Sequence, residues 1–376
     1  MITRQFQKTL DRRLREKNPL MQILLGPRQV GKTTGAKAIF EAWAGPKIFE
    51  SADSPVPPQA SWIQHHWEQA RLKGPGTLLI LDEIQKVPGW SEQVKILFDE
   101  DRNKRDLRIL LLGSSSLYLQ KGMTESLAGR FELLQAPHWS WPEFQEAFGW
   151  DFDTYFWFGA YPGAVPFIQE ESRWRQYILN SIIEPVLGKD ILGQQPVKNP
   201  ALFRQTFELA VQYPAQVISL QKLLGQLQDR GNAATIKHYL TLLEQCFLIK
   251  TLQKFTGSPI QTKGSSPKII VLNQALAFAY QPQERIKQEL ERHGHLFESL
   301  VGAHLSLLPD TELFYWREGN DEVDYVIQSP SGTRAIEIKS SIRPRRGKGL
   351  QAFSKRYPTI QCETWNFDRC MEFLKK

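Results

Sequence analysis

The chain has 376 residues, of which 41% are hydrophobic and 23% are charged, and its formal net charge is +7 at pH 7. This length exceeds the usual size of one hydrophobic core, so we expect two or three soluble globular domains. No apolar run is long enough to span a membrane, and the first residues lack the apolar core of a signal peptide, which argues against membrane insertion and export. Three cysteines without paired metal-ligand spacing fit a reducing cytosol, so we expect a cytoplasmic protein. The moderate basic excess is compatible with a local patch that binds nucleic acid.

A phosphate-binding loop is the most informative feature of the chain. The apolar run 23–25 leads into GPRQVGKTT at residues 26–34, and the following residues can form a helix. In this Walker A pattern, glycines let successive backbone N–H groups point at phosphate oxygens, and the helix directs its positive end at the anion. A glycine-rich turn without a ligand would not require this strand and helix. Lys32 is placed for the β- and γ-phosphates and the Thr33 hydroxyl for Mg2+. The residues predicted to bind the nucleotide are Gly26, Pro27, Arg28, Gln29, Val30, Gly31, Lys32, Thr33 and Thr34.

An acidic pair follows a second apolar run, as in a Walker B motif. Residues 77–81 are continuously apolar, which is typical of a central parallel strand, and they end in Asp82 and Glu83. Ligands of such sheets lie at the carboxyl ends of the strands, so both carboxylates are predicted to face the phosphates. We expect Asp82 to hold Mg2+ and Glu83 to polarise the attacking water. The alternative is a solvated turn or a helix cap.

Two further polar features fit the same site. The apolar run 109–112 leads into consecutive serines, and Ser114 or Ser115 is a candidate for sensing the γ-phosphate or positioning water; the pattern does not distinguish between them. Arg130 follows a helix-breaking glycine, and a cation there can reach the γ-phosphate of a neighbouring subunit as an arginine finger. The alternative is a surface arginine without a catalytic part.

The predicted parallel sheet extends to about residue 144, and an aromatic-rich segment overlaps its end. Residues 139–166 combine many aromatic side chains with glycine and proline. Such a segment can stack on nucleic-acid bases. We favour interdomain packing, which is the commoner use of aromatic side chains.

The middle of the chain is predicted to be helical. From 173 to 250 apolar residues recur at helical spacing, and Asn232 is placed to cap the third of three short helices. This order suggests a winged helix-turn-helix, with Lys237 and His238 near the start of the recognition helix. The alternative is a helical lid that contacts only protein.

The C-terminal third combines a helix with three predicted strands. A helix begins near residue 294, and the strand candidates are 312–316, 322–326 and 334–339. Asp324, Glu337 and Lys339 can project from one face of the paired strands. Metal-dependent nucleases use such carboxylates to hold Mg2+ and such a lysine to orient water. The metal set would comprise Glu298, Asp324, Glu337 and Lys339, with a basic loop at 343–348 to hold a phosphate backbone. The alternative is a charged, exposed sheet face.

Three segments together resemble the prokaryotic AAA-type ATPases that carry a C-terminal domain of unknown function: 26–34, DEIQKVPGW at 82–90, and SLAGR at 126–130. The resemblance continues through 158–162, 235–240 and the Glu337-x-Lys339 region, and so spans nearly the whole chain. It implies an α/β fold with four parts. These are an AAA+ ATPase core at 1–144, a helical lid or linker at 145–195, a winged-helix-like domain at 196–260 and a restriction-endonuclease-like domain at 261–376. Asn273 departs from the family, in which we expect an acidic residue after the strand.

The resemblance also carries functional expectations. It assigns Lys32, Thr33, Asp82 and Glu83 to the nucleotide site and Arg130 to the finger role. We expect an ATPase that uses ATP and Mg2+, forms a homo-oligomeric ring such as a hexamer, and couples hydrolysis to movement on DNA or its remodelling, without a membrane partner. One alternative is a nucleotide-dependent switch that binds a protein partner, with an inert C-terminal scaffold. Another is a DNA nuclease licensed by ATP.

Overall fold

The computed structural model describes residues 2–17, 20–102, 104–113, 127–193, 197–219, 221, 224–225, 232–256, 265–340 and 347–375. The chain divides into two compact units, Met1–His138 and Trp139–Lys376. The division falls a few residues before the boundary that we expected at 144.

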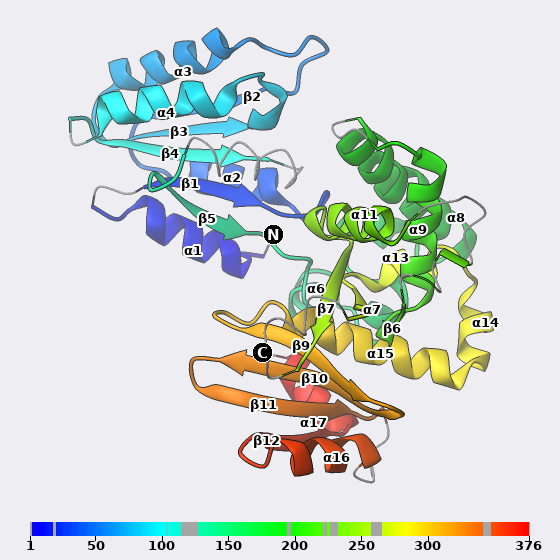
Figure 1. Ribbon diagram of the computed structural model, residues 1–376. Helices are drawn as coiled ribbons and strands as arrows, with labels where there is room; N and C mark the ends of the chain where they lie inside the picture. Colours follow the sequence, from blue (N-terminus) through cyan, green and yellow to red (C-terminus); the bar gives the residue numbers. More distant parts are fainter. Residues whose placement is uncertain are drawn as a thin grey trace. The chain divides into compact units, whose positions relative to one another are not determined.

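The first unit is built on a parallel sheet in the order β2-β3-β4-β1-β5 (Figure 1). Its strands are β1 (Met21–Leu25), β2 (Lys47–Ser51), β3 (Thr77–Asp82), β4 (Leu107–Leu112) and β5 (Phe131–Gln135). Every residue of β1 and β3 is buried, because helices cover both faces of the sheet. The strands expected from the three apolar runs are therefore confirmed.

The helices of this unit lie on both faces of the sheet. They are α1 (Gln5–Leu14), α2 (Lys32–Glu41), α3 (Ala60–Lys73) and α4 (Trp90–Asp101), with a 3-10 turn η1 (Ile84–Lys86). Helices α3 and α4 pack together on one side of the sheet, and α1 lies on the other side, against α2, β1 and β5 (Figure 1). The packing of α1 on α2 is close, because a Cβ atom on Gly35 would lie 2.9 Å from the Phe6 ring.

The second unit begins with the aromatic-rich segment, which forms a packed core. The first elements of this unit are α6 (Trp141–Phe148), α7 (Phe152–Phe158), η2 (Pro162–Phe167), α8 (Glu171–Tyr177), η3 (Ile178–Ile183) and η4 (Val186–Leu192). Phe144 is fully buried and meets Trp150 and Tyr155 with ring centroids 4.8 and 5.8 Å apart. These contacts favour a packing role over an exposed stacking surface.

A second sheet runs through this unit in the order β12-β11-β10-β9-β7-β8-β6. Its strands are β6 (Gln216–Val217), β7 (Ile249–Lys254), β8 (Lys268–Val271), β9 (Glu312–Glu318), β10 (Asp321–Ser329), β11 (Gly332–Ile338) and β12 (Gln361–Trp365). Strand β8 pairs antiparallel with both β6 and β7, and β7 continues the sheet by pairing parallel with β9. The expected domain boundary at 260 therefore falls between two strands that pair with each other.

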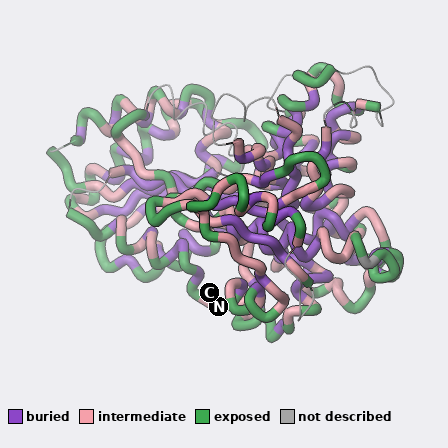
Figure 2. The backbone as a smooth tube through the Cα atoms, turned by 60° about the horizontal axis from the view of Figure 1, so that its bottom comes forward, coloured by how far each residue is buried: buried purple, intermediate pink, exposed green. Residues whose placement is uncertain are grey.

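The remaining helices pack around this sheet. They are α9 (Pro200–Gln212), α11 (Ala233–Gln245), α13 (Gln274–Phe278), α14 (Gln283–Gln288), α15 (Leu290–Leu305), α16 (Lys348–Arg356) and α17 (Phe367–Leu374). Asn232 caps α11, as expected, by accepting a hydrogen bond from the Thr235 backbone N–H at 2.8 Å. Figure 2 shows buried residues along the strands of the sheets and along the inner faces of the helices. Within the described part of the chain, no helix is long and apolar enough to cross a membrane.

Candidate nucleotide-binding site

The loop between β1 and α2 has a backbone that requires glycine at both of its ends. Gly26 has a φ of 157°, and a Cβ atom there would lie 2.2 Å from the carbonyl oxygen of Ala136. Gly31 has a φ of 90° and begins α2 in the left-handed region, which side chains disfavour. The loop therefore turns sharply onto the first turn of α2, where the backbone N–H groups and the helix dipole favour an anion.

Lys32 and Thr33, on the first turn of α2, both point to the carboxyl edge of the sheet. The Lys32 ammonium is buried and donates to the carbonyl oxygens of Gly26 at 2.9 Å and Pro27 at 2.6 Å. Thr33 Oγ1 donates to Asp82 Oδ2 at 2.9 Å, which joins the loop to the end of β3. The structure thus brings together the lysine, the hydroxyl and the carboxylate that the sequence singles out. Their chemistry fits a magnesium nucleotide: an ammonium for phosphate, and a hydroxyl and a carboxylate as hard oxygen ligands for Mg2+.

The two acidic residues after β3 differ in their surroundings. Asp82 is buried, and burial raises the pKa of its carboxyl, while the hydrogen bond from Thr33 opposes the rise. Glu83 has a φ of 54°, uncommon for a residue with a side chain, and its Oε2 accepts a hydrogen bond from Gln85 Nε2 at 2.6 Å. Sequence reasoning missed Gln85, although the residue stands only two places after Glu83.

Arg130 lies away from the loop of its own chain. Arg130 immediately precedes β5, and its carbonyl oxygen accepts a hydrogen bond from the Met21 N–H at the amino end of β1. The phosphate-binding loop follows the opposite, carboxyl end of β1. Its guanidinium pairs with both carboxylate oxygens of Asp99, at 2.7 and 2.8 Å. The other two predicted catalytic residues, Ser114 and Ser115, lie outside the described residues.

Arg4 is a second residue that sequence reasoning missed. Its side chain is buried and donates to the carbonyl oxygen of Val30, in the loop, at 2.9 Å. It also donates to the carbonyl oxygens of Pro137 at 3.0 Å and His138 at 3.2 Å, the last residues of the first unit. One guanidinium therefore braces the phosphate-binding loop against the segment that leaves the unit.

In the second unit, the strand register places the predicted nuclease-like residues near one another. Tyr325 of β10 pairs with Ile336 of β11, so the next residues along, Asp324 and Glu337, are cross-strand neighbours. Asp324 Oδ2 accepts from the Ile338 backbone N–H at 2.7 Å. Glu337 instead contacts Lys339 Nζ at 2.8 Å.

A buried lysine, Lys268, lies among three carboxylates, of which Asp324 is one. Lys268 Nζ lies 2.5 Å from Glu298 Oε1, 3.0 Å from Glu322 Oε1 and 3.7 Å from Asp324 Oδ1. Burial raises the pKa of Asp324 to about 7, and the carboxylate of Glu298 adds to the rise. Among the residues that the structure describes, no three histidine, cysteine, aspartate or glutamate side chains are grouped to hold a metal ion. In this arrangement the predicted nuclease-like set does not fit a divalent metal.

Comparison with known families identifies the domain that carries the loop. Residues 18–145 match the model of an AAA domain, which covers both the loop and the Asp82–Glu83 pair. Residues 149–286 and 293–366 match two domains of unknown function, DUF8612 and DUF4143. These matches support an AAA-type core followed by a C-terminal domain of unknown function, and their descriptions name neither a winged helix nor a nuclease.

Relatives and solved structures extend the comparison. Two proteins described as uncharacterized, from Mycobacterium tuberculosis and Mycobacterium bovis, are each 26% identical over 338 residues, covering 88% of this chain and 72% of their own. The Thermotoga maritima RuvB Holliday junction branch migration motor is 16% identical, with a TM-score of 0.35 over 65% of this chain and 88% of its own. The Aeropyrum pernix ORC1 protein, solved in complex with DNA, is 13% identical, with a TM-score of 0.31 over 76% of this chain and 93% of its own.

Proposed function

We propose that the first unit is a magnesium-dependent ATPase. The observation that supports this proposal best is the 2.9 Å hydrogen bond from Thr33 to Asp82, because these are the two side chains proposed to hold Mg2+. The match of residues 18–145 to an AAA domain supports it independently. Bound Mg2+ would neutralise phosphate charge and polarise the terminal phosphoryl group.

The proposed roles follow from the contacts of each side chain. In the structure, the Lys32 ammonium donates to carbonyl oxygens of the loop. On nucleotide binding it would donate to phosphate oxygens instead, and the backbone N–H groups of the loop would bind the other phosphate oxygens. Thr33 and Asp82 would hold Mg2+. Glu83 would orient the attacking water and draw its proton, with Gln85 fixing the direction of the carboxylate.

We further propose that the protein works as a homo-oligomeric ring, such as a hexamer. Arg130 lies at the edge of the sheet opposite to its own loop, so a finger role requires a second copy of the chain. The Asp99 carboxylate holds this arginine in the single chain, and assembly would transfer the guanidinium to a neighbouring nucleotide.

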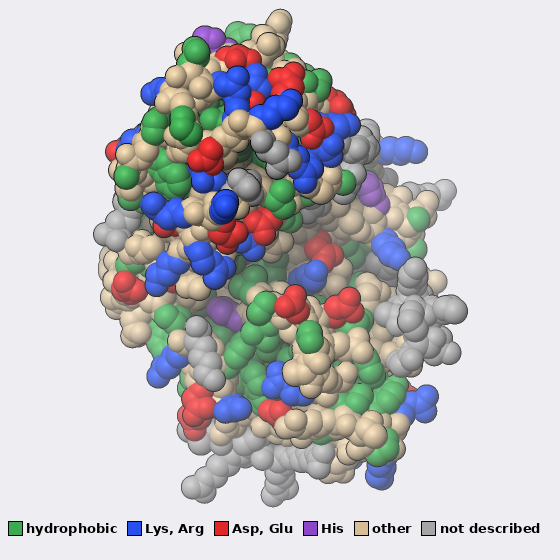
Figure 3. All heavy atoms as spheres, turned by 90° about the vertical axis from the view of Figure 1, so that its left-hand side faces the viewer, with side chains coloured by type: hydrophobic (Ala, Val, Ile, Leu, Met, Phe, Trp, Pro, Cys, Tyr) green, Lys and Arg blue, Asp and Glu red, His purple; other side chains and the backbone are tan. Residues whose placement is uncertain are grey.

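Coupling to DNA is proposed through the middle of the second unit. The chain order α9, β6, α11, β7, β8, with β8 between β6 and β7, is that expected of a winged helix. Lys237 and His238 are exposed on α11, whereas the next residue, Tyr239, is buried. On the face shown in Figure 3, basic and acidic side chains are interspersed, so any DNA contact there depends on local groups and not on a uniform basic surface.

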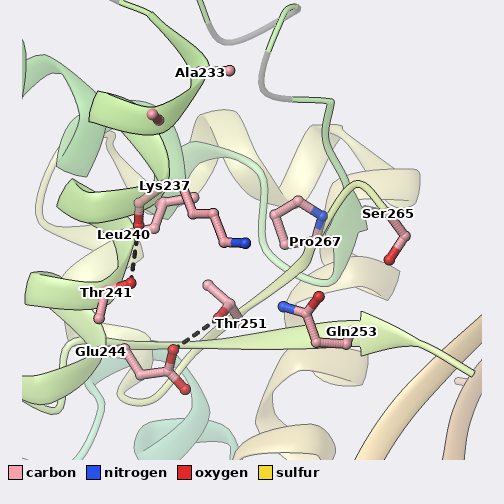
Figure 4. Close-up of a pocket in the computed structure, with 10 residues that line it drawn as sticks. Ala233, Lys237, Leu240, Thr241, Glu244, Thr251, Gln253, Ser265 and Pro267 are labelled. Carbon is pink, nitrogen blue, oxygen red and sulfur yellow. Dashed lines mark hydrogen bonds between the residues drawn. The ribbon is translucent and has the colours of Figure 1, made fainter. Parts of the chain in front are cut away.

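Beside these exposed residues, α11, the strand β7 and the segment that leads into β8 border a pocket of about 440 Å³ (Figure 4). The Lys237 side chain extends into it, toward Thr251 and Gln253 of β7. Glu244 also borders the pocket and accepts a hydrogen bond from Thr251 Oγ1 at 2.7 Å. Among the described residues that border this pocket, Lys237 alone carries an ammonium group, so its removal best tests contact with a phosphate backbone.

The test of the ATPase assignment compares Lys32→Ala with Glu83→Gln. We expect Lys32→Ala to abolish nucleotide binding, because its ammonium neutralises phosphate charge, and Glu83→Gln to bind normally but lose turnover, because its carboxylate acts on water. Titration with a fluorescent ATP analogue and a steady-state phosphate-release assay separate the two effects. Loss of binding in a folded Glu83→Gln protein would reject this division of roles.

A further inference from the structure

We propose that the Lys268 ammonium takes the place of a divalent cation among the carboxylates of Glu298, Glu322 and Asp324, so that the second unit holds a metal-free ion cluster and no nuclease centre. The inference does not depend on the proposed ATPase, because none of these residues lies in the first unit. It explains why a nuclease-like spacing of acidic residues occurs in this chain without a metal site.

The cluster joins three separate elements. Lys268 begins β8, Glu298 lies on α15, and Glu322 and Asp324 lie on β10. The lysine side chain is 0% exposed, and its ammonium contacts carboxylate oxygens of both other elements. A buried ammonium of this kind is stable only when it is paired, and here the lysine and its carboxylates compensate one another.

A metal ion and this ammonium would compete for the same oxygen atoms. Mg2+ binds oxygen at about 2.0–2.1 Å and requires several ligands around one point. Lys268 Nζ already lies 2.5 Å from Glu298 and 3.0 Å from Glu322, so the space between these oxygens is filled. Asp324 has one oxygen committed to the Ile338 N–H, which leaves the other facing the ammonium at 3.7 Å.

The charge of the lysine persists in this setting. Burial lowers the pKa of Lys268, but the carboxylates of Glu298, Asp324 and Glu322 outweigh it, and its pKa stays above the ordinary value. His295 Nδ1 lies 3.6 Å from Glu298 Oε2, and this carboxylate raises the pKa of the imidazole. The cluster therefore contains its own cation, the Lys268 ammonium.

Glu337, the remaining carboxylate of the predicted metal set, is held in another direction. Its Oε1 lies 2.8 Å from Lys339 Nζ, and its Oε2 accepts the Gly347 backbone N–H at 3.1 Å. A Cβ atom on Gly347 would lie 2.1 Å from Glu337 Oε1, so a larger residue there would displace this carboxylate. Glu337 and Lys339 form a pair of their own beside the Lys268 cluster.

The first test measures Mn2+ binding to nucleotide-free protein by electron paramagnetic resonance. We compare the full-length wild-type chain with Asp324→Asn and, as an independent variant, Glu298→Gln. We expect all three proteins to bind the same number of Mn2+ ions, because the cluster holds none in the wild type. One ion that is bound by the wild type and lost in both variants would overturn the inference.

The second test removes the resident cation. Lys268→Met leaves the carboxylates of Glu298, Glu322 and Asp324 without their lysine, so we expect a lower melting temperature than the wild type and a rise of several degrees on addition of Mn2+. Lys339→Met is the matched control, because it removes a neighbouring lysine and leaves Lys268 in place; its melting temperature should not respond to Mn2+ more than that of the wild type. Absence of any Mn2+ response in a folded Lys268→Met protein would overturn the inference.

Discussion

At the residue scale, the contact between Gln85 and Glu83 bears most directly on turnover. Gln85 Nε2 donates to Glu83 Oε2 at 2.6 Å, and a hydrogen bond to a charged group is worth about 1.5–3 kcal/mol. If Glu83 activates water, Gln85→Ala should lower kcat roughly tenfold and leave nucleotide affinity unchanged, since Gln85 donates to the carboxylate that acts on water. Steady-state ATPase rates and fluorescent-nucleotide titration measure the two quantities.

The control for this prediction is the neighbouring residue. Lys86→Ala removes a side chain that pairs with Asp53 instead of Glu83. We expect its kcat to stay close to that of the wild type. Equal losses of kcat in the two variants would show that the turn after β3, and not the contact to Glu83, determines the rate.

Arg4 yields a stability prediction at the same scale. Its buried guanidinium donates to the carbonyl oxygens of Val30, Pro137 and His138, and Arg4→Ala would leave these acceptors without their donor. We expect a loss of roughly 2–4 kcal/mol in the free energy of unfolding, measured by urea denaturation. Arg12→Ala, an exposed arginine of the following helix, should change it by no more than about 0.5 kcal/mol. Similar losses in both variants would contradict the bracing role of Arg4.

At the scale of elements, local sequence patterns predict strands and loops better than they predict which side chains contact one another. The strands β1, β3 and β4 are predictable because a continuous apolar run is the pattern of a strand covered on both faces. The contact of Thr33 with Asp82 follows from motif chemistry, since both residues end up at one edge of the sheet. The position of Lys268 is not predictable from pattern, because a lysine on a strand ordinarily faces solvent and only the fold supplies its three carboxylates.

The position of Arg130 at the amino edge of the sheet leads to a complementation prediction. Mixing inactive Arg130→Ala with inactive Lys32→Ala should restore part of the ATPase activity, because some mixed interfaces pair an intact arginine with an intact loop. Arg105→Ala, an exposed arginine that pairs with Asp101, should retain activity without mixing. Absence of complementation in subunits shown to exchange would favour a surface role for Arg130.

At the scale of the whole molecule, sequence reasoning gives the order of parts but not where the cores divide. The change in composition near 139–166 lies at the end of the first unit, where a new aromatic core begins. The pairing of β7 with both β8 and β9 joins segments that we assigned to separate domains. Such long-range pairing leaves no local pattern, since strand register depends on the partner strand.

The last prediction concerns the link between the two units in function. If hydrolysis is coupled to DNA, then single-stranded, duplex or branched DNA should raise the ATPase rate. Lys237→Ala should reduce this stimulation and leave the basal rate unchanged, because Lys237 lies on α11 of the second unit and not in the nucleotide site. Loss of one phosphate contact should also reduce, by about one, the slope of the logarithm of the DNA-binding constant against the logarithm of the salt concentration.

Lys250→Ala is the matched control, since Lys250 pairs with Glu244 at 2.9 Å and does not border the pocket. Its stimulation by DNA should equal that of the wild type. An ATPase rate that responds to none of the three DNA forms would instead favour the nucleotide-dependent switch that binds a protein partner. In that case a protein partner could bind the exposed face of α11. The ion cluster around Lys268 would also be compatible with a second unit that serves as a scaffold. The fold is the same under both functions, so the ATPase measurement is what separates them.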